Sequence, residues 1–134
     1  MVIFHAETDE NIEPLMAILK AEGILAGVAL LRSTVPSKVA NLINAADHVM
    51  IFAGTLGKMG GSASLIQTEK IRLIKMINNK VEIGWDGGAN IDNIFSISRA
   101  GADVINVGSA LAFANDPKTV YESMINQIDK SDVV

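Results

Sequence analysis

Five short apolar runs recur along the chain, and four of them contain two or more β-branched residues. They cover residues 2–4, 26–31, 48–52, 81–85 and 104–107. The runs are continuous rather than alternating between apolar and polar positions. Continuous runs are typical of strands that are buried on both faces, as in a parallel sheet. The sequence therefore predicts five parallel strands.

Segments with helical periodicity separate the runs. Pro36 marks one helix start, and Asp116-Pro117 marks another, with Asp116 as the N-cap. The first predicted helix begins at Thr8 or Asp9 and ends at Gly23, and the second runs from Pro36 through Ile43. The third covers residues 65–78, and the fourth runs from Ile91 to Gly101 with Ile94 and Phe95 on its apolar face. The fifth extends from Asp116 to Ile128. The chain thus repeats a strand and a helix five times, at a spacing of about 20–30 residues. We expect a single α/β domain over residues 1–134.

Composition and charge narrow the class of protein. Apolar residues make up 49% of the chain and charged residues only 19%, so we expect part of the apolar surface to meet another chain. The net charge is −4, without a basic block, which argues against a nucleic-acid partner. The chain has no cysteine, no signal-peptide pattern and no apolar run of about 20 residues. The sequence predicts a cytoplasmic protein without a membrane span.

Candidate chemistry lies where the predicted strands end. In βα repeats, ligands bind at the carboxyl ends of the strands, which here read HAETD, LLRST, FAGTLGKMGG, WDGGAN and VGSA. Three of the five ends are rich in glycine, which lets backbone N–H groups approach a phosphate closely. Gly87-Gly88 and Gly108-Ser109 are candidate phosphate ligands on this argument. The alternative is that these glycines only form tight turns.

Several pieces, in order, resemble the ribulose-phosphate 3-epimerase family. They are FHAE, AGVAL, a strand whose following loop ends in GG, the DGG at residues 86–88, and GADVINVGSA. The resemblance covers nearly the whole chain and implies a ribulose-phosphate-binding (βα)8-barrel fold. It extends over the fourth to the eighth strand of such a barrel. We therefore expect a partial TIM (βα) barrel of about five βα units that lacks the first three strands.

The resemblance also implies roles for individual residues. Asp86 stands where the family has a carboxylate that binds a divalent metal (Zn, Fe, Mn or Co) and transfers protons through an enediolate. The glycine pair Gly60-Gly61 joins Gly87-Gly88 and Gly108-Ser109 as phosphate ligands. His5 stands where a histidine lines the pocket, although a packing role is the alternative. The second carboxylate and the metal-binding histidines belong to strands that this chain lacks.

This chain also departs from the family pattern at several positions. Trp85 precedes Asp86 where a smaller residue is usual, and we expect it to crowd the barrel interior. Lys58, in the loop GTLGKMGG, contacts an anion or is solvated, and Arg32 contacts substrate or an ion-pair partner.

Asp86 itself has a simpler interpretation, as an acid hydrogen-bonded to its glycine turn or to the next helix. Glu7 is expected near the start of the first helix.

The sequence leads to one functional hypothesis and three alternatives. The hypothesis is a partial barrel that binds sugar phosphate or phosphate, has little or no epimerase activity alone, and forms a homodimer through its open strand edges. One alternative is an active pentose-phosphate 3-epimerase completed by a second copy or a partner chain, with His5 and Asp86 of two chains forming a composite metal site. The others are a flavodoxin-like open sheet and a folded fragment without a ligand.

Overall fold

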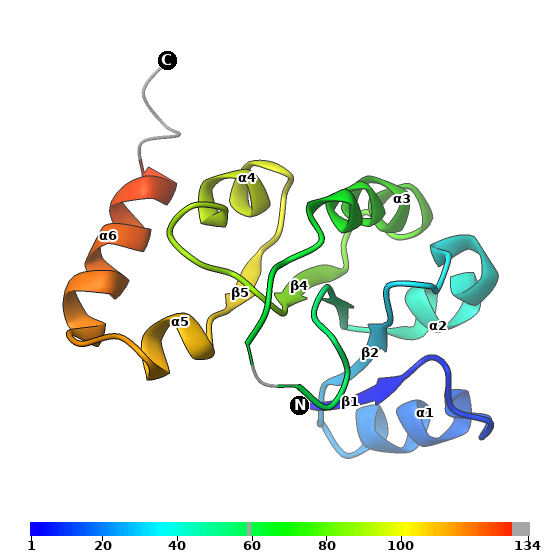
Figure 1. Cartoon of the computed structure of the whole chain (residues 1–134). Helices are drawn as coiled ribbons and strands as arrows, with labels where there is room; N and C mark the ends of the chain where they lie inside the picture. Colours follow the sequence, from blue (N-terminus) through cyan, green and yellow to red (C-terminus); the bar gives the residue numbers. More distant parts are fainter. Residues whose placement is uncertain (59, 130–134) are drawn as a thin grey trace.

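A computed structural model describes residues 1–58 and 60–129 of the chain. Its five strands form one parallel sheet in the order β1-β2-β3-β4-β5 (Figure 1). The strands are β1 (Val2–His5), β2 (Ala26–Leu30), β3 (His48–Phe52), β4 (Glu82–Asp86) and β5 (Val104–Asn106). All five predicted strands are confirmed, with ends that differ by a residue or so. A flavodoxin-like sheet has the order 2-1-3-4-5, so that alternative is wrong.

Helical segments connect successive strands and follow the last one. They are α1 (Glu13–Ala21), η1 (Pro36–Val39), α2 (Ala40–Ala45), η2 (Leu65–Thr68), α3 (Glu69–Ile77), α4 (Ile94–Arg99), α5 (Ser109–Ala112) and α6 (Pro117–Asp129). Asp116 caps α6 as predicted, because its Oδ1 accepts hydrogen bonds from the N–H groups of Lys118 (3.1 Å) and Thr119 (3.3 Å). The short helix α5 was not predicted.

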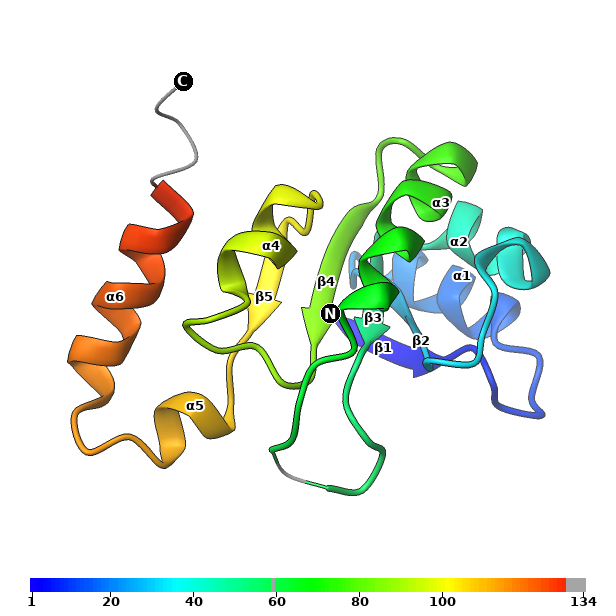
Figure 2. The ribbon, with the colours of Figure 1, turned by 45° about the horizontal axis from the view of Figure 1, so that its top comes forward.

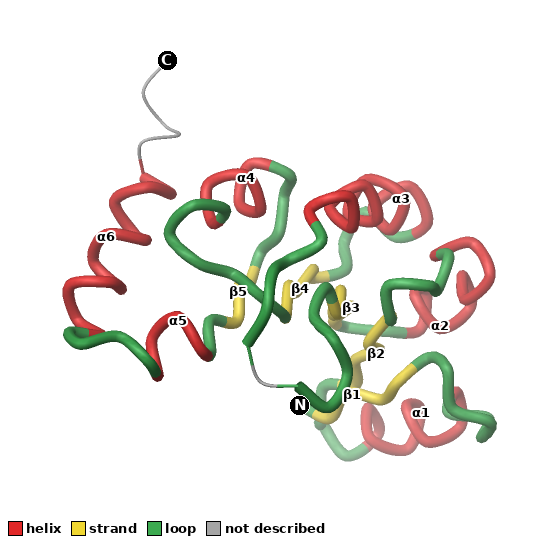
Figure 3. Tube along the Cα trace, viewed as in Figure 1, coloured by secondary structure: helices red, strands yellow, loops and turns green. Residues whose placement is uncertain are grey.

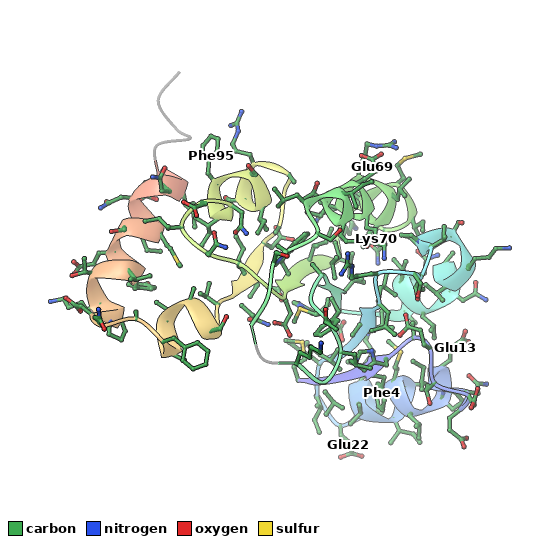
Figure 4. All side chains as sticks on the ribbon, in the orientation of Figure 1. Phe4, Glu13, Glu22, Glu69, Lys70 and Phe95 are labelled. Carbon is green, nitrogen blue, oxygen red and sulfur yellow. The ribbon has the colours of Figure 1, made fainter. Side chains whose placement is uncertain are left out.

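Two predicted helices begin later than the sequence pattern indicates. The first starts at Glu13 rather than after Thr8 or Asp9, with a proline in its first turn. The fourth starts at Ile94 rather than Ile91, because the side chains of Asn90 and Asn93 hold residues 90–93 in a turn. Phe95, expected on its apolar face, is 41% exposed and points away from the sheet (Figure 4).

The hydrophobic core lies between the sheet and helices α1 to α4, which Figures 1 and 2 show around the outside of the curved strands. Alternate strand residues face these helices because side chains of a strand point to opposite sides in turn. The fully buried ones include Val28, Leu30, Ile51, Ile83 and Trp85. Burial of each such side chain contributes about 1.5–3 kcal/mol. This layer fixes the strands whose ends carry the candidate site.

The opposite, inner face of the sheet carries glycines and polar residues together with a few large apolar ones, among them Ile3 and Met50. The ring of His48 lies over Gly84, where an added Cβ would come within 2.7 Å of its Cε1 atom. Its Nδ1 lies 2.6 Å from Glu82 Oε1. We assign His48 no site role, because it begins β3 at the end of the strand away from the glycine turns.

The edge strands are less buried than predicted. All of β2 is buried, whereas Val2 and Ile3 of β1 are 40% and 37% exposed, and Val104 of β5 is 37% exposed. The expectation of burial on both faces is therefore wrong for β1 and β5. Within residues 1–58 and 60–129, no helix has the length and apolar character needed to cross a membrane.

Candidate functional site

Three glycine turns meet at the carboxyl ends of β3, β4 and β5. The loop that follows β3, formed by residues 53–58 and 60–64 and here called the β3 loop, runs beside the turn that follows β4 (Figure 3). Together they enclose a cavity of about 190 Å³. Its lining includes Lys58, Gly60, Asp86, Gly87, Gly88, Asn106, Gly108 and Ser109. The sequence-predicted residues Gly60, Gly87, Gly88, Gly108 and Ser109 thus share one cavity, and Gly61 lines an adjoining one with Gly60, Gly88 and Ser109.

The glycines of the β4 turn are required by close backbone packing. Gly87 and Gly88 have φ values of 112° and 68°, which favour glycine. A Cβ at Gly88 would lie 2.7 Å from the carbonyl carbon of Ser62, and one at Gly87 would lie 2.6 Å from the Cα of Gly54. The β3 loop therefore packs directly onto this turn. The tight-turn interpretation accounts for these two glycines without any ligand.

Gly108 differs from the other glycines of the cavity. Its φ is −102°, and no described atom lies within 4 Å of a Cβ placed on it. Neither a left-handed conformation nor a close neighbour among the described residues requires a glycine there. The open space beside the Gly108 backbone could hold part of a bound ligand. The preceding strand positions Gly108, and the β3 loop lies close by, since a Cβ on Gly60 would lie 3.5 Å from Ser109 Oγ.

Asp86 is the last residue of β4 and points into the cavity side of the sheet. It pairs in register with Phe52 of β3 and Asn106 of β5. Its backbone carbonyl accepts a hydrogen bond from Ala53 N–H (2.7 Å). Within the described part of the chain, its carboxylate makes neither a hydrogen bond nor an ion pair. The simpler interpretation, a carboxylate bonded to its own turn or to the next helix, therefore finds no support.

His5 lies apart from the cavity. Its Nδ1 is 3.4 Å from Glu7 Oε2, and its ring meets Phe52 edge-on with 6.4 Å between centroids. His5 does not line the cavity that contains Asp86. Within residues 1–58 and 60–129, the two residues belong to no group of three or more metal-ligating side chains. The contacts of His5 agree with a packing role.

The expectation that Trp85 crowds the barrel interior is wrong. Trp85 is fully buried in the core on the helix side of the sheet, opposite Asp86. Its Nε1 donates a hydrogen bond to the carbonyl of Gly87 (3.1 Å). The error arose because adjacent residues of a strand face opposite sides, which puts Trp85 and Asp86 in different environments. Trp85 consequently leaves the cavity free.

Asn106 is a cavity residue that the sequence analysis missed. It lines the cavity beside Asp86, and among the described residues its Nδ2 has only a distant sulfur partner, Met50 Sδ at 3.8 Å. Residues 104–107 were predicted as one apolar strand, and the single amide within them was given no weight. A polar residue near the carboxyl end of a predicted barrel strand was the available signal. Its amide is placed to exchange hydrogen bonds with a ligand next to Asp86.

A polar cluster fixes the end of β2 nearby. Lys70 projects from α3 (Figure 4), and its Nζ donates hydrogen bonds to the carbonyls of Leu31 (2.6 Å) and Arg32 (3.1 Å). Burial lowers the pKa of Lys70, and the charge of Glu7 opposes that effect. Arg32 is exposed beside a separate hollow of about 270 Å³.

Glu7 belongs to the same cluster. Its Oε1 accepts hydrogen bonds from Leu31 N–H (2.9 Å) and from the Thr34 hydroxyl. Burial raises the pKa of Glu7, but the hydrogen bonds from Thr34 and Leu31 outweigh it, so the net pKa is lowered. The expectation that Glu7 lies at a helix start is wrong, because α1 begins only at Glu13.

The residues around Asp86 do not fit a resident divalent metal. In residues 1–58 and 60–129, no group of three or more His, Cys, Asp and Glu side chains is close enough together to hold one. Lys58, a cation, lines the same cavity as Asp86. Divalent metals in proteins are held by several such ligands. The described residues of this chain therefore do not form the metal site that the resemblance implies.

The parallel strands follow one another in chain order, the helices cover their outer side, and glycine-rich turns lie at the carboxyl ends of the strands. These features define a protein of the (βα)-barrel class. A model of the ribulose-phosphate 3-epimerase family matches residues 1–112. The chain belongs to this family. Its fold resembles that of 3-hexulose-6-phosphate synthase from Salmonella typhimurium, with a TM-score of 0.74 at 20% identity over 96% of this chain and 61% of that one.

Curated relatives agree with the family at low identity. The ribulose-phosphate 3-epimerase of Escherichia coli K12 is 27% identical over 135 residues, which cover 97% of this chain and 60% of that protein. The Aquifex aeolicus enzyme of the same name is 30% identical over 116 residues, covering 84% of this chain and 52% of that protein. The chain thus spans about 60% or less of the length of these relatives.

Proposed function

We propose that this chain binds a sugar phosphate, with the phosphoryl group held by the turns at Gly60-Gly61, Gly87-Gly88 and Gly108-Ser109. The observation that carries the proposal is the convergence of these turns on one cavity next to the carboxylate of Asp86, which has no partner among the described residues. Glycine backbones present N–H groups to an anion at short range. Lys58 adds a positive charge on the cavity wall, and Ser109 adds a hydroxyl donor. The open space at Gly108 supports the same interpretation.

The sugar part of such a ligand would lie toward Asp86 and Asn106. The two side chains stand side by side on β4 and β5, and together they offer a carboxylate and an amide to hydroxyl or carbonyl groups. The family membership points to a phosphorylated ketopentose such as ribulose 5-phosphate. The backbone turns would supply affinity, while Asp86 and Asn106 would select the sugar.

We further propose that the chain alone epimerises sugar phosphates slowly or not at all. Inversion at carbon requires one group that removes a proton on one face and another that returns a proton on the opposite face. Asp86 is the one carboxylate among the described residues that line the cavity. Asn106 cannot exchange protons at neutral pH. Asp86 is therefore left without an acid/base partner.

An active enzyme assembled from two copies is the second candidate. The open edges at β1 and β5 favour it, because exposed strands invite pairing with another chain. Val2, Ile3 and Val104 present apolar side chains at these edges. We propose a homodimer formed through them, in which a second copy supplies further groups to the mouth of the barrel.

Calorimetry and a coupled enzyme assay test both proposals. Ribulose 5-phosphate should bind the purified chain, ribulose should bind at least tenfold more weakly, and Ser109→Ala should weaken only the phosphorylated ligand. Equal affinity for ribulose and its phosphate would refute the phosphate site. Turnover of ribulose 5-phosphate with added divalent metal should remain near background. A turnover rate per chain that rises with protein concentration would favour the assembled enzyme.

A further inference from the structure

We infer that Trp85 and Asn93 are positioning residues for the phosphoryl group: they hold the two carbonyls of the β4 turn on the helix side, so that the N–H groups of Gly88 and Ala89 face the cavity. This inference rests on the proposed phosphate site and deepens it. Neither side chain lines that cavity. Both act through the backbone that they hold.

Trp85 sets the orientation of the first peptide unit in the turn. Its indole is fully buried among core side chains, and its Nε1 donates to the Gly87 carbonyl at 3.1 Å. In a trans peptide, the carbonyl of one residue and the N–H of the next point in opposite directions. No cis peptide occurs among the described residues. With the Gly87 carbonyl directed at the indole, the Gly88 N–H is directed away from the core, toward the side on which the cavity lies.

Asn93 sets the second peptide unit in the same way. Its Nδ2 donates to the Gly88 carbonyl at 2.9 Å, and Asn90 Nδ2 adds a longer bond of 3.3 Å to the same oxygen. Asn93 is itself fixed, because its Oδ1 accepts a hydrogen bond from Asn90 N–H at 2.8 Å. The Ala89 N–H consequently also points away from these side chains. Two successive N–H groups directed to one side form a concave anion-binding surface.

The alternative is that Trp85 only fills the core and satisfies its own N–H group. A buried indole N–H usually bonds to a carbonyl. Two further observations favour positioning. Gly87 and Gly88 have both their carbonyls held by side chains, and within the described residues neither Gly88 N–H nor Ala89 N–H donates to another protein group. Gly88 and Ala89 both line the cavity, so a ligand or water there can accept these hydrogen bonds.

The experiment separates the hydrogen bond from the packing of the ring. Trp85→Phe keeps an aromatic ring in the core but removes the N–H donor. Asn93→Asp keeps the oxygen that accepts from Asn90 but replaces the donor facing the Gly88 carbonyl. Ile97→Val is the matched control, because Ile97 is fully buried in the same layer and its side chain has no group that could donate a hydrogen bond to the turn carbonyls. Inorganic phosphate is titrated into ¹⁵N-labelled protein, and urea unfolding is measured for each variant.

In the wild type, phosphate should shift the amide signals of Gly88 and Ala89. Trp85→Phe and Asn93→Asp should each weaken phosphate binding about tenfold, equivalent to about 1.4 kcal/mol, and should reduce those two shifts. Ile97→Val should lose stability without losing phosphate affinity. Phosphate binding by both turn variants with wild-type affinity and full shifts would overturn this inference alone. A wild type that binds no phosphate would overturn the proposed function together with it.

Discussion

The close contact between the β4 turn and the β3 loop gives the sharpest test of the site architecture. The perturbation is Gly88→Ala, and its control is Gly23→Ala. Both glycines have similar left-handed backbones, with φ of 68° and 72°. A Cβ on Gly23 would meet no described atom within 4 Å, whereas a Cβ on Gly88 would press on the backbone of Ser62 and Ala63. The pair therefore separates conformational strain from steric overlap.

The expected magnitudes follow from these two contributions. A left-handed alanine costs about 1–2 kcal/mol in either variant. Overlap with backbone atoms that cannot rotate away adds about 1–3 kcal/mol at Gly88. Gly88→Ala should therefore lose about 2–5 kcal/mol in total, against about 1–2 kcal/mol for Gly23→Ala. With a typical dependence on urea, the midpoint for Gly88→Ala should fall about 1 M below that of the control.

Urea unfolding followed by far-UV circular dichroism measures this difference. Amide hydrogen exchange in the β3 loop provides a second reading, because the loop can relieve the overlap by moving away from the turn. Gly88→Ala should then show faster exchange at Ala63 and weaker binding of phosphate. Equal unfolding midpoints for the two variants, with unchanged exchange in the loop, would refute the close packing on which the site depends.

Further predictions concern charge, space, pH and assembly. Gly108→Ala should change stability by no more than about 1 kcal/mol and still weaken phosphate binding in calorimetry, because the methyl group occupies free space; unaltered affinity would argue against a phosphoryl group there. Asp86→Asn should tighten phosphate binding about twofold to fivefold by removing a like charge, and weaker binding would instead indicate that the carboxylate holds a cation. Because hydrogen bonding lowers the pKa of Glu7, its stabilising effect should be complete above its ordinary value of 4.5 and fade as pH falls below it, so Glu7→Gln should flatten the acid limb of the stability curve. Light scattering should give about twice 14.2 kDa, and a concentration-independent monomer would contradict the homodimer.

The number of strands followed from the sequence because the responsible signals are local and strong, whereas the barrel-like strand order was implied only by the family resemblance. Continuous β-branched runs mark strands that are buried on both faces, and β2 and β3 behave in that way. The edge strand β1 looks the same in sequence but is exposed, because burial on the second side depends on a neighbour that composition does not specify. Helix starts were less predictable. At α4 the side chains of Asn90 and Asn93 compete with the helix for backbone groups.

The candidate site was predictable only in part. Strand-end glycines indicated which turns would meet, because parallel strands bring their carboxyl ends to one edge. The side on which Trp85 lies was misjudged, although alternation from Asp86 would have placed it in the core. The hydrogen bond from its indole to the Gly87 carbonyl depends on the three-dimensional path of the turn, so the sequence pattern cannot predict it. Asn106 could have been found, since it is the one amide within an apolar run.

A crystal structure of the chain with ribulose 5-phosphate tests the central claim most directly. The phosphoryl group should be enclosed by the turns at Gly60-Gly61, Gly87-Gly88 and Gly108-Ser109, and it should accept hydrogen bonds from the N–H groups of Gly88 and Ala89. The sugar should extend toward Asp86 and Asn106. A phosphoryl group bound instead at Arg32, or a fully formed complex in which these turns make no contact with the ligand, would contradict it.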